Sequence, residues 1–402
     1  MTPIKLAVVI SHPTQHFVPL YKELASYEGI DLKVFYLAEN GVQGAHDADF
    51  GLDVKWDTPM LEGYEYEFVE PGRVLTDFGF WSVDSPRLNE MLANFNADWL
   101  WVHGYAQRAN WRAILAKKKY VKSIYTSDSN AWITPHKNAA FYIKRVVKYL
   151  GVRLFFKHIN IFLAISPANH EYLLRYGVPD KKIVKTSFPI DIQRLHDARQ
   201  SLQTPPQTQL QKLKDSLNLT EREKIIVTVS KLTMRKRVAD IVESLSRLKD
   251  SSVHLIVVGS GECSEQLSNQ VEQLNLSQRV HLVGFVNQSE LPKYLALSDV
   301  FVFASENEPY GAVVSEALPF SLPVVIARKI GAIGASAIDG VNALIFNVGD
   351  VEDLTQKLDM LLSNHETMQS MSKQSLAMSA QHDKSVMAND IYTVCKQDQE
   401  ES

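Results

Sequence analysis

Residues 300–326 read VFVFASENEPYGAVVSEALPFSLPVVI and contain three elements in succession. The apolar run Val300–Phe303 predicts a buried strand, and the polar residues that follow it predict a loop. The loop is expected to open a helix at about Gly311, and Pro323–Ile326 predicts the next strand. A strand, a helix and a second strand in this order indicate a βαβ unit of a parallel sheet.

The same alternation occupies most of the chain on both sides of a polar segment. The first series of expected strands is Leu6–Ile10, Leu32–Tyr36, Trp99–Val102, Ser123–Thr126 and Ile161–Ile165, with helical spacing at Val18–Ser26 and Ser85–Phe95. The second series is Ile225–Val229, Val253–Val258, Arg279–Val283, Val300–Phe303, Pro323–Ile326 and Ala343–Phe346. Residues 191–223 are rich in Gln, Pro, Thr and Lys, which predicts a connection between two domains. The fold class is therefore α/β with two Rossmann-like halves, which bind ligands beyond the carboxyl ends of their strands.

Composition narrows the class of protein. A chain of 402 residues is too long for a single domain with one hydrophobic core. Its 45% hydrophobic and 22% charged residues are typical of a globular protein. A net charge of −4 argues against nucleic acid as the main partner. Two cysteines, Cys263 and Cys395, predict neither a disulfide framework nor a zinc site, and they favour a reducing cytosol. The run Ile4–Ile10 is too short for a signal peptide, and no stretch is long enough to span a membrane. We expect a cytoplasmic protein.

Two carboxylates in residues 300–326 mark a candidate ligand site. Glu308 lies in the expected loop and Glu316 inside the helix, with seven residues between them, so both could face one ligand. The amides of Gly311, Ala312 and Val313 open the helix, where free donors and the helix dipole favour a phosphate. The alternative is two surface glutamates on an ordinary helix.

The order of these features resembles the retaining glycosyltransferases of family 4, which build bacterial envelope and capsule glycans and whose signature is Glu, seven residues and Glu. The resemblance covers nearly all of residues 4–395 and is densest in the second half. It implies the GT-B fold, in which two Rossmann-like βαβ domains face each other across a cleft. The implied parts are an acceptor-side domain (1–190), a linker (191–223), a nucleotide-sugar-binding domain (224–380) and a helix crossing back to the first domain (381–402).

The resemblance also implies roles for the donor site. Glu308 would contact sugar hydroxyls and Glu316 the ribose. The family's basic motif appears altered in residues 230–237, SKLTMRKR, where Lys231 replaces an arginine and Lys236 matches the family lysine. Both would grip the diphosphate and stabilise the charge that develops on the leaving group. Other donor contacts implied by position are Pro309, Tyr310, Gly311, Ala312, Val313, Gly259, Gly284, Phe285 and Val286.

The first half departs further from the family. His103 matches a histidine often seen in this domain, although a structural role for it stays open. Asp128 is the nearest match to a second, missing histidine, and both are counted as candidate catalytic residues. The usual glycine-rich loop after the first strand is replaced by polar residues at 12–16, from which Gln15 and His16 are expected on the acceptor side. Asn130 is expected there as well.

A local excess of positive charge predicts a contact with a membrane. Residues 108–157 contain twelve Lys or Arg residues and one acid, Asp128, interleaved with apolar residues from Phe141 to Phe156. A basic amphipathic helix can lie on an anionic membrane, which here is the inner face of the plasma membrane. The alternative is a helix that packs its apolar side on the first domain and leaves a solvated basic face.

We therefore expect a retaining transferase that moves a sugar from a nucleotide-diphosphate donor to a hydroxyl of a glycan or lipid-linked acceptor in cell-surface polysaccharide synthesis, such as lipopolysaccharide or capsule. No cofactor and no metal are expected. Uridine, guanosine and thymidine donors all stay open, with uridine expected on frequency alone. Two alternatives also stay open: a nucleotide-sugar epimerase of the same fold, and a degenerate transferase that serves as a binding or assembly subunit.

Overall fold

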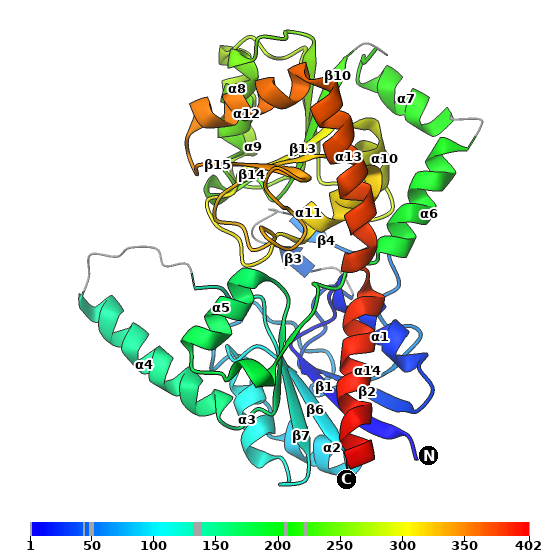
Figure 1. Ribbon diagram of the computed structural model, residues 1–402. Helices are drawn as coiled ribbons and strands as arrows, with labels where there is room; N and C mark the ends of the chain where they lie inside the picture. The colour runs from blue at the N-terminus through cyan, green and yellow to red at the C-terminus, as the bar shows by residue number, and fades with distance from the viewer. Residues whose placement is uncertain are drawn as a thin grey trace. The chain divides into compact units, whose positions relative to one another are not determined.

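The computed structural model describes residues 2–42, 45–47, 52–131, 139–204, 208–220 and 223–401. The chain divides into two compact units. The first unit comprises Met1–Ala45, Pro59–Pro189 and Lys384–Ser402, and the second comprises His46–Thr58 and Ile190–Asp383. Figure 1 shows a twisted sheet inside each unit, with helices on its faces.

The first unit is built on a seven-stranded sheet of order β5-β2-β1-β6-β7-β8-β9. All of its strand pairs are parallel. Its strands are β1 (Ile4–Ile10), β2 (Ile30–Tyr36), β5 (Glu65–Phe68), β6 (Trp99–His103), β7 (Lys122–Thr126), β8 (Ile161–Ala164) and β9 (Ile183–Lys185). Its helices are α1 (Phe17–Ala25), α2 (Arg87–Phe95), α3 (Arg108–Ala116), α4 (Ala139–Phe156), α5 (Pro167–Arg175) and α14 (Lys384–Glu401).

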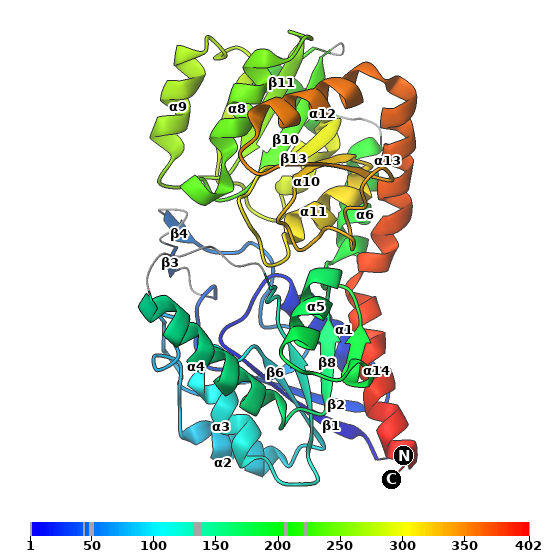
Figure 2. The same cartoon turned by 60° about the vertical axis from the view of Figure 1, so that its left-hand side comes forward.

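Helices on both faces explain why the strands of this sheet read as continuous apolar runs. Figures 1 and 2 show α1 and α14 on one side of the sheet and α2, α3 and α4 on the other. In β1, six of the seven residues are buried. Each fully buried Val, Leu or Ile side chain contributes about 1.5–3 kcal/mol relative to an exposed one. The expected first series of strands is confirmed, and the structure adds β5 and β9, whose short, half-exposed sequences carry little apolar signal.

The second unit contains a six-stranded parallel sheet of order β12-β11-β10-β13-β14-β15. Its strands are β10 (Lys224–Val229), β11 (Val253–Val258), β12 (Val280–Gly284), β13 (Val300–Phe303), β14 (Val324–Ala327) and β15 (Ala343–Phe346). Its helices include α8 (Val238–Arg247), α9 (Ser264–Gln273), α10 (Leu291–Leu297), α11 (Ala312–Ala317), α12 (Val351–Ser363) and α13 (His365–Ser379). Figure 2 shows α8 and α9 on one face of the sheet and α10 and α11 on the other. The expected α/β class with two Rossmann-like halves is confirmed.

Two segments differ from the expected division of the chain. Residues 191–204, expected in a linker, lie in the second unit, where α6 (Ile192–Gln203) contacts α10 and the turn after α11. The helix α7 (Thr208–Ser216) also contacts α10. Apolar residues of α6 such as Leu195 and Leu202 are buried, which explains why this polar-looking segment joins a core. The second unit also takes up His46 and Asp47 from the strand β3 (Ala45–Asp47), the strand β4 (Leu52–Val54) and residues 55–58.

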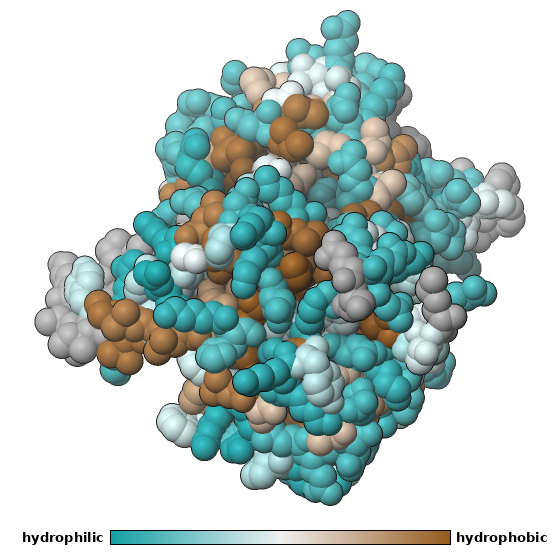
Figure 3. Space-filling view, turned by 60° about the horizontal axis from the view of Figure 1, so that its bottom comes forward, coloured by the Kyte–Doolittle hydropathy of each residue, from teal (hydrophilic) through white to brown (hydrophobic). Residues whose placement is uncertain are grey.

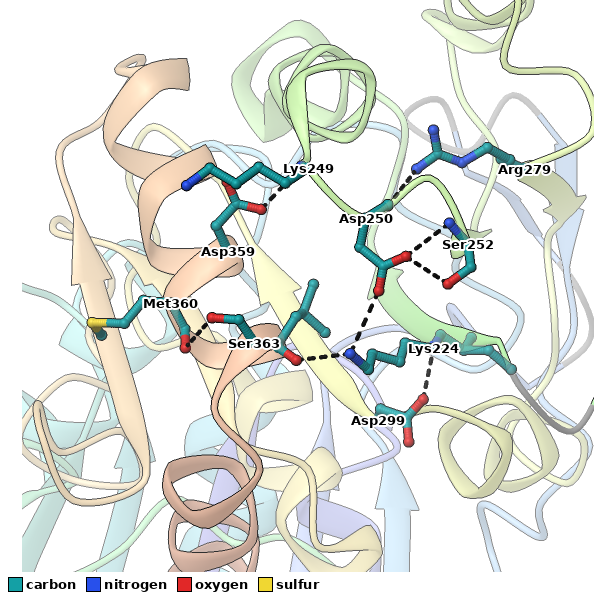
Figure 4. A network of polar contacts seen from close by, with 11 residues as sticks. Lys224, Lys249, Asp250, Ser252, Arg279, Asp299, Asp359, Met360 and Ser363 are labelled. Atoms are coloured by element: carbon teal, nitrogen blue, oxygen red, sulfur yellow. Dashed lines mark hydrogen bonds and ion pairs between the residues drawn. The ribbon is translucent and has the colours of Figure 1, made fainter.

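The amino-terminal ends of the strands in the second unit are fastened by a polar network (Figure 4). Lys224, which opens β10, donates to Leu362 O at 2.8 Å and pairs with Asp250 at 3.5 Å. Asp299 accepts from the amide of Ile225 at 2.8 Å. These bonds satisfy polar groups where strands begin, so this edge of the sheet serves the fold and leaves the carboxyl-terminal edge for ligands.

Candidate active site

Glu308 is the centre of a charged cluster in the second unit. It lies between β13 and α11, and its side chain is 10% exposed. Its Oε1 accepts hydrogen bonds from Lys236 Nζ at 2.5 Å, Arg235 Nη1 at 2.7 Å and Ser305 Oγ at 2.7 Å. Charge-assisted bonds of this kind are about twice as strong as neutral ones, so they fix the orientation of the carboxylate.

Three positively charged side chains, Lys231, Arg235 and Lys236, gather around the single carboxylate of Glu308. Burial lowers the pKa of Lys236, Glu308 opposes that shift, and Arg235 and Lys231 lower the pKa further through charge repulsion. The Lys236 ammonium also lies 5.5 Å from the centre of the Phe303 ring. Three cations are thus gathered near one buried carboxylate, an arrangement suited to a further anionic ligand such as a diphosphate.

Close backbone contacts shape the loops around this cluster. Gly259 has φ of +140°, and a Cβ there would lie 1.8 Å from Ser230 O. A Cβ on Gly331 would lie 1.9 Å from Pro309 O. Gly311 has φ of +94° immediately before α11. Only glycine fits such positions without displacing the backbone, so these residues hold the loops at the carboxyl ends of β10, β11, β13 and β14 together.

Glu316 occupies a different environment from Glu308. It is the fifth residue of the six-residue helix α11, as expected inside the helix, and the chain passes into a tighter turn at Leu318. The residue is 5% exposed, and burial raises its pKa to about 7, with Arg194 acting in the opposite direction. Arg194 itself donates to both oxygens of Gln288, at 3.1 Å to the carbonyl and 3.0 Å to the side chain. Glu316 is therefore a buried carboxyl that titrates near neutral pH.

Other expected donor contacts lie on neighbouring loops of the same unit. Gly284 ends β12, and its carbonyl accepts from the amide of Gly259 at 2.8 Å. Phe285 and Val286 follow at the surface, both half-buried. Tyr310 is buried and shares a 3.0 Å hydrogen bond with Ser315, so its hydroxyl serves the packing of α11.

Arg235, Ser305 and Arg194 were missed as site residues by the sequence analysis. Arg235 precedes Lys236 in the motif SKLTMRKR, and Ser305 stands three residues before Glu308, so both lay inside quoted stretches. Arg194 lies 122 positions before Glu316 along the chain, and nothing in the sequence pairs the two. A local sequence pattern does not indicate which cation from a distant part of the chain acts on a given carboxylate.

The first unit holds the remaining candidates. His103 ends β6, shares a 3.0 Å hydrogen bond with Tyr21, and packs edge-on against Phe17 with ring centres 4.4 Å apart. Burial lowers its pKa to about 3, so its imidazole is neutral at physiological pH. These contacts favour the structural role that was left open for it.

The other polar candidates of this unit lie in loops after the strands. Gln15 and His16 interact with each other at 3.3 Å, and His16 also packs against Phe188. Asp128 is exposed and Asn130 half-exposed in the loop after β7.

The described residues show no group of three or more His, Cys, Asp or Glu side chains that could hold a metal ion. In the same ranges, no helix combines the length and the apolar character needed to cross a membrane.

The helix α4 presents an apolar surface to solvent. Val152, Phe155 and Phe156 are buried, and Phe155 packs on Trp111 of α3 with ring centres 4.8 Å apart. Outside this core, the exposed side chains are Tyr142, Val146, Val147, Leu150 and Leu154, each more than half exposed. Lys144, Lys148 and Arg153 lie exposed between them. Figure 3 shows a brown surface along α4, at the left, with hydrophilic teal atoms next to it.

Sequence comparisons relate the part of the chain that holds this site to known glycosyltransferases. Residues 210–378 match the family model described as "Glycosyl transferases group 1". The chain is 29% identical over 188 residues to the alpha-monoglucosyldiacylglycerol synthase of Acholeplasma laidlawii, a match covering 46% of each chain. It is 26% identical over 341 residues to N,N'-diacetylbacillosaminyl-diphospho-undecaprenol alpha-1,3-N-acetylgalactosaminyltransferase of Campylobacter jejuni, covering 80% of this chain and 82% of that one. For the first three curated relatives, the match spans less than half of their length.

Solved structures share the fold over the whole chain. A glycosyltransferase from Rickettsia africae superposes with a TM-score of 0.73 at 18% identity, covering 100% of both chains. Anabaena Alr3699/HepE in complex with UDP and glucose gives 0.71 at 18% identity, covering 98% of this chain and 100% of that one. The fold is therefore the GT-B arrangement of two Rossmann-like sheets, and the Glu308 cluster lies within residues 210–378, the part of the chain that matches the group 1 glycosyltransferase model.

Proposed function

We propose that the protein is a retaining glycosyltransferase that transfers a sugar from a nucleotide-diphosphate donor to a hydroxyl of a glycan or lipid-linked acceptor in cell-surface polysaccharide synthesis. The observation that carries the proposal is the buried Glu308 carboxylate with Lys236 and Arg235 on one oxygen, inside the segment that matches the group 1 family. One relative is named as an alpha-monoglucosyldiacylglycerol synthase and another as a transferase acting on a diphospho-undecaprenol-linked sugar, which supports a lipid-linked acceptor. The UDP bound to Anabaena Alr3699/HepE, which shares the fold, supports uridine as the base.

The cluster can perform a front-face displacement. Lys231 and Lys236 bind the diphosphate and stabilise its negative charge as the bond to the sugar breaks. A phosphate oxygen of the departing diphosphate accepts the proton of the incoming hydroxyl, which attacks the anomeric carbon from the same face. Glu308 accepts hydrogen bonds from sugar hydroxyls and positions the donor, and Glu316 contacts the ribose. Because lysine and arginine supply the positive charge, the proposal requires no metal ion and no cofactor, and turnover should persist in a chelator.

Release of free nucleoside diphosphate tests the proposed reaction. A panel of uridine, guanosine and thymidine diphosphate sugars is incubated with the protein, with and without a membrane lipid extract. We expect release from one donor that depends on the extract, and a product whose anomeric proton coupling shows the donor configuration. An inverted product would contradict the mechanism, release without acceptor would favour an epimerase or hydrolase, and binding without turnover would favour a degenerate subunit.

We also propose that the protein lies on the cytoplasmic face of an anionic membrane through α4. The exposed apolar side chains of this helix can enter the boundary between headgroups and acyl chains, while Lys144, Lys148 and Arg153 contact anionic headgroups. Each cation near such a surface contributes about 1 kcal/mol of attraction. This placement would bring the enzyme to a lipid-linked acceptor without a membrane-spanning helix.

A further inference from the structure

A short segment from the first part of the chain is built into the second unit beside the candidate donor site. Residues 55–57 are fastened to the loop after β12 by side-chain hydrogen bonds. Asn287 Nδ2 donates to Lys55 O at 2.7 Å, and Asn287 Oδ1 accepts from the amide of Asp57 at 3.3 Å. The Asp57 carboxylate accepts from the amide of Ser289 at 3.1 Å and from its hydroxyl. These bonds fix the backbone on both sides of Trp56.

Trp56 lies next to Phe285. Their ring centres are 6.3 Å apart with planes inclined by 50°, and both side chains are half-buried. Phe285 follows Gly284, whose carbonyl is bonded to Gly259, and Gly259 in turn abuts Ser230 at the start of the motif that contains Lys231 and Lys236. A continuous line of loop contacts therefore joins the aromatic pair to the basic motif.

The position of the pair suits the base end of a nucleotide. The β12 strand is the edge of the sheet, two strands from β10, and the basic motif follows β10. Neighbouring strands lie about 4.8 Å apart, so the two loops are separated by roughly 10 Å. A diphosphate held by the basic motif would leave the ribose and base to extend along the carboxyl-terminal edge toward β12.

We propose that Trp56, together with Phe285, forms the aromatic wall that binds the nucleobase of the donor, and that Asn287 and Asp57 are positioning residues for Trp56. This inference rests on the proposed function, because it requires a nucleotide at the site. An indole ring stacks on any heteroaromatic base, so the wall selects nucleotides over ligands without a base and discriminates weakly between bases. The competing explanation is that Trp56 only packs residues 46–58 onto the second unit.

Nucleotide affinity in matched variants separates these explanations. The dissociation constants of UDP and of inorganic pyrophosphate, which has no base, are measured by calorimetry for the wild type, Trp56→Ala, Trp56→Phe and Trp81→Ala. Trp81 is 73% exposed in the first unit and serves as the control. We expect Trp56→Ala to weaken UDP binding about tenfold or more, as base stacking on an aromatic side chain contributes that much, with pyrophosphate unchanged. Trp56→Phe should stay within about threefold of wild type and lose part of the fluorescence change on UDP addition.

The outcomes also distinguish the two proposals. Wild-type UDP affinity in Trp56→Ala would overturn the role of Trp56 and leave the proposed function intact. Equal losses for UDP and pyrophosphate would show a purely structural role and overturn the inference in the same way. If the wild-type protein binds none of the uridine, guanosine, thymidine and adenosine diphosphates, both the inference and the proposed function fail.

Discussion

The ammonium of Lys236 lies 2.5 Å from Oε1 of Glu308, and the same oxygen also accepts a bond from Arg235. The two cations and the carboxylate belong to loops that follow β10 and β13, which are neighbours in the sheet. We expect a bound diphosphate to compete with Glu308 for the two cations, because both are anions. Glu308 would then offer oxygen lone pairs to sugar hydroxyls, so one ion pair couples diphosphate binding to sugar positioning.

Replacing Glu308 tests this coupling. Glu308→Gln keeps the shape but removes the charge, so we expect turnover to fall by about 10²–10³, as for a charge-positioning group in a closed site. Glu306→Gln, at an exposed neighbour, should retain wild-type turnover. Initial rates of diphosphate release are measured together with denaturant unfolding, since loss of the carboxylate leaves Lys236 buried without this partner. Wild-type turnover in a folded Glu308→Gln would remove Glu308 from the site.

Replacing Lys231 or Lys236 is expected to weaken diphosphate binding more than replacing another lysine of the second unit. Lys231→Met and Lys236→Met should each weaken nucleoside diphosphate binding and lower turnover by about 10²-fold or more, because they remove charge that stabilises the leaving group. Lys249→Met is the matched control, an exposed lysine near the amino-terminal ends of the strands (Figure 4). Equal behaviour of all three variants in calorimetry and rate measurements would show that general surface charge, and not this motif, binds the diphosphate.

Glu316 should make the stability of the protein depend on pH. Burial raises its pKa from 4.5 to about 7, so its stabilising contribution is fully present below about pH 4.5 and is lost as the pH rises through 7. The free energy of unfolding of wild type minus that of Glu316→Gln should therefore fall by about 3 kcal/mol across this window. Urea unfolding at a series of pH values measures the difference. Glu366→Gln, an exposed carboxylate on α13, is the control, and a flat difference for Glu316→Gln would contradict the assignment.

The loss of stability caused by three Gly→Ala substitutions should follow the space available for the added Cβ at each position. Gly259→Ala and Gly331→Ala place a Cβ within 2 Å of a backbone oxygen, so the loops must move and we expect both stability and nucleotide binding to suffer strongly. Gly284→Ala has positive φ but nothing within 4 Å of its Cβ, so it should cost only about 1–2 kcal/mol. Thermal unfolding and diphosphate affinity check the order. An equal effect at all three positions would show that close backbone approach does not matter here.

Membrane association should depend on the exposed face of α4. The double variant Val147→Ser with Leu150→Ser removes two exposed apolar side chains, and we expect its binding to vesicles containing phosphatidylglycerol to fall at least tenfold, with UDP affinity unchanged. Binding should also weaken as salt is raised, because the attraction is partly electrostatic. Met360→Ser, at an exposed residue on α12, is the control. Cosedimentation of the double variant at the wild-type level would exclude α4 as the contact.

Local patterns were sufficient for most of the fold. The strand Val253–Val258 could be predicted because five of its six residues are apolar, and Val300–Phe303 because all four are; every residue of both strands is buried. The short strand β5, Glu65–Phe68, could not, because it is half-exposed and polar. The helix α6 looked like a linker because its few apolar side chains are widely spaced, although they are buried in the second unit.

The sequence by itself determined the two βα series, the candidate carboxylates Glu308 and Glu316, and the basic motif, because each depends on residues close together in the chain. Only the tertiary structure decided that Lys236 contacts Glu308, that Trp56 lies against Phe285, and that the apolar side chains of α4 face solvent. The physical reason is that periodicity reports which residues are apolar or charged. Which distant residue covers or neutralises them depends on packing between elements that the pattern does not specify.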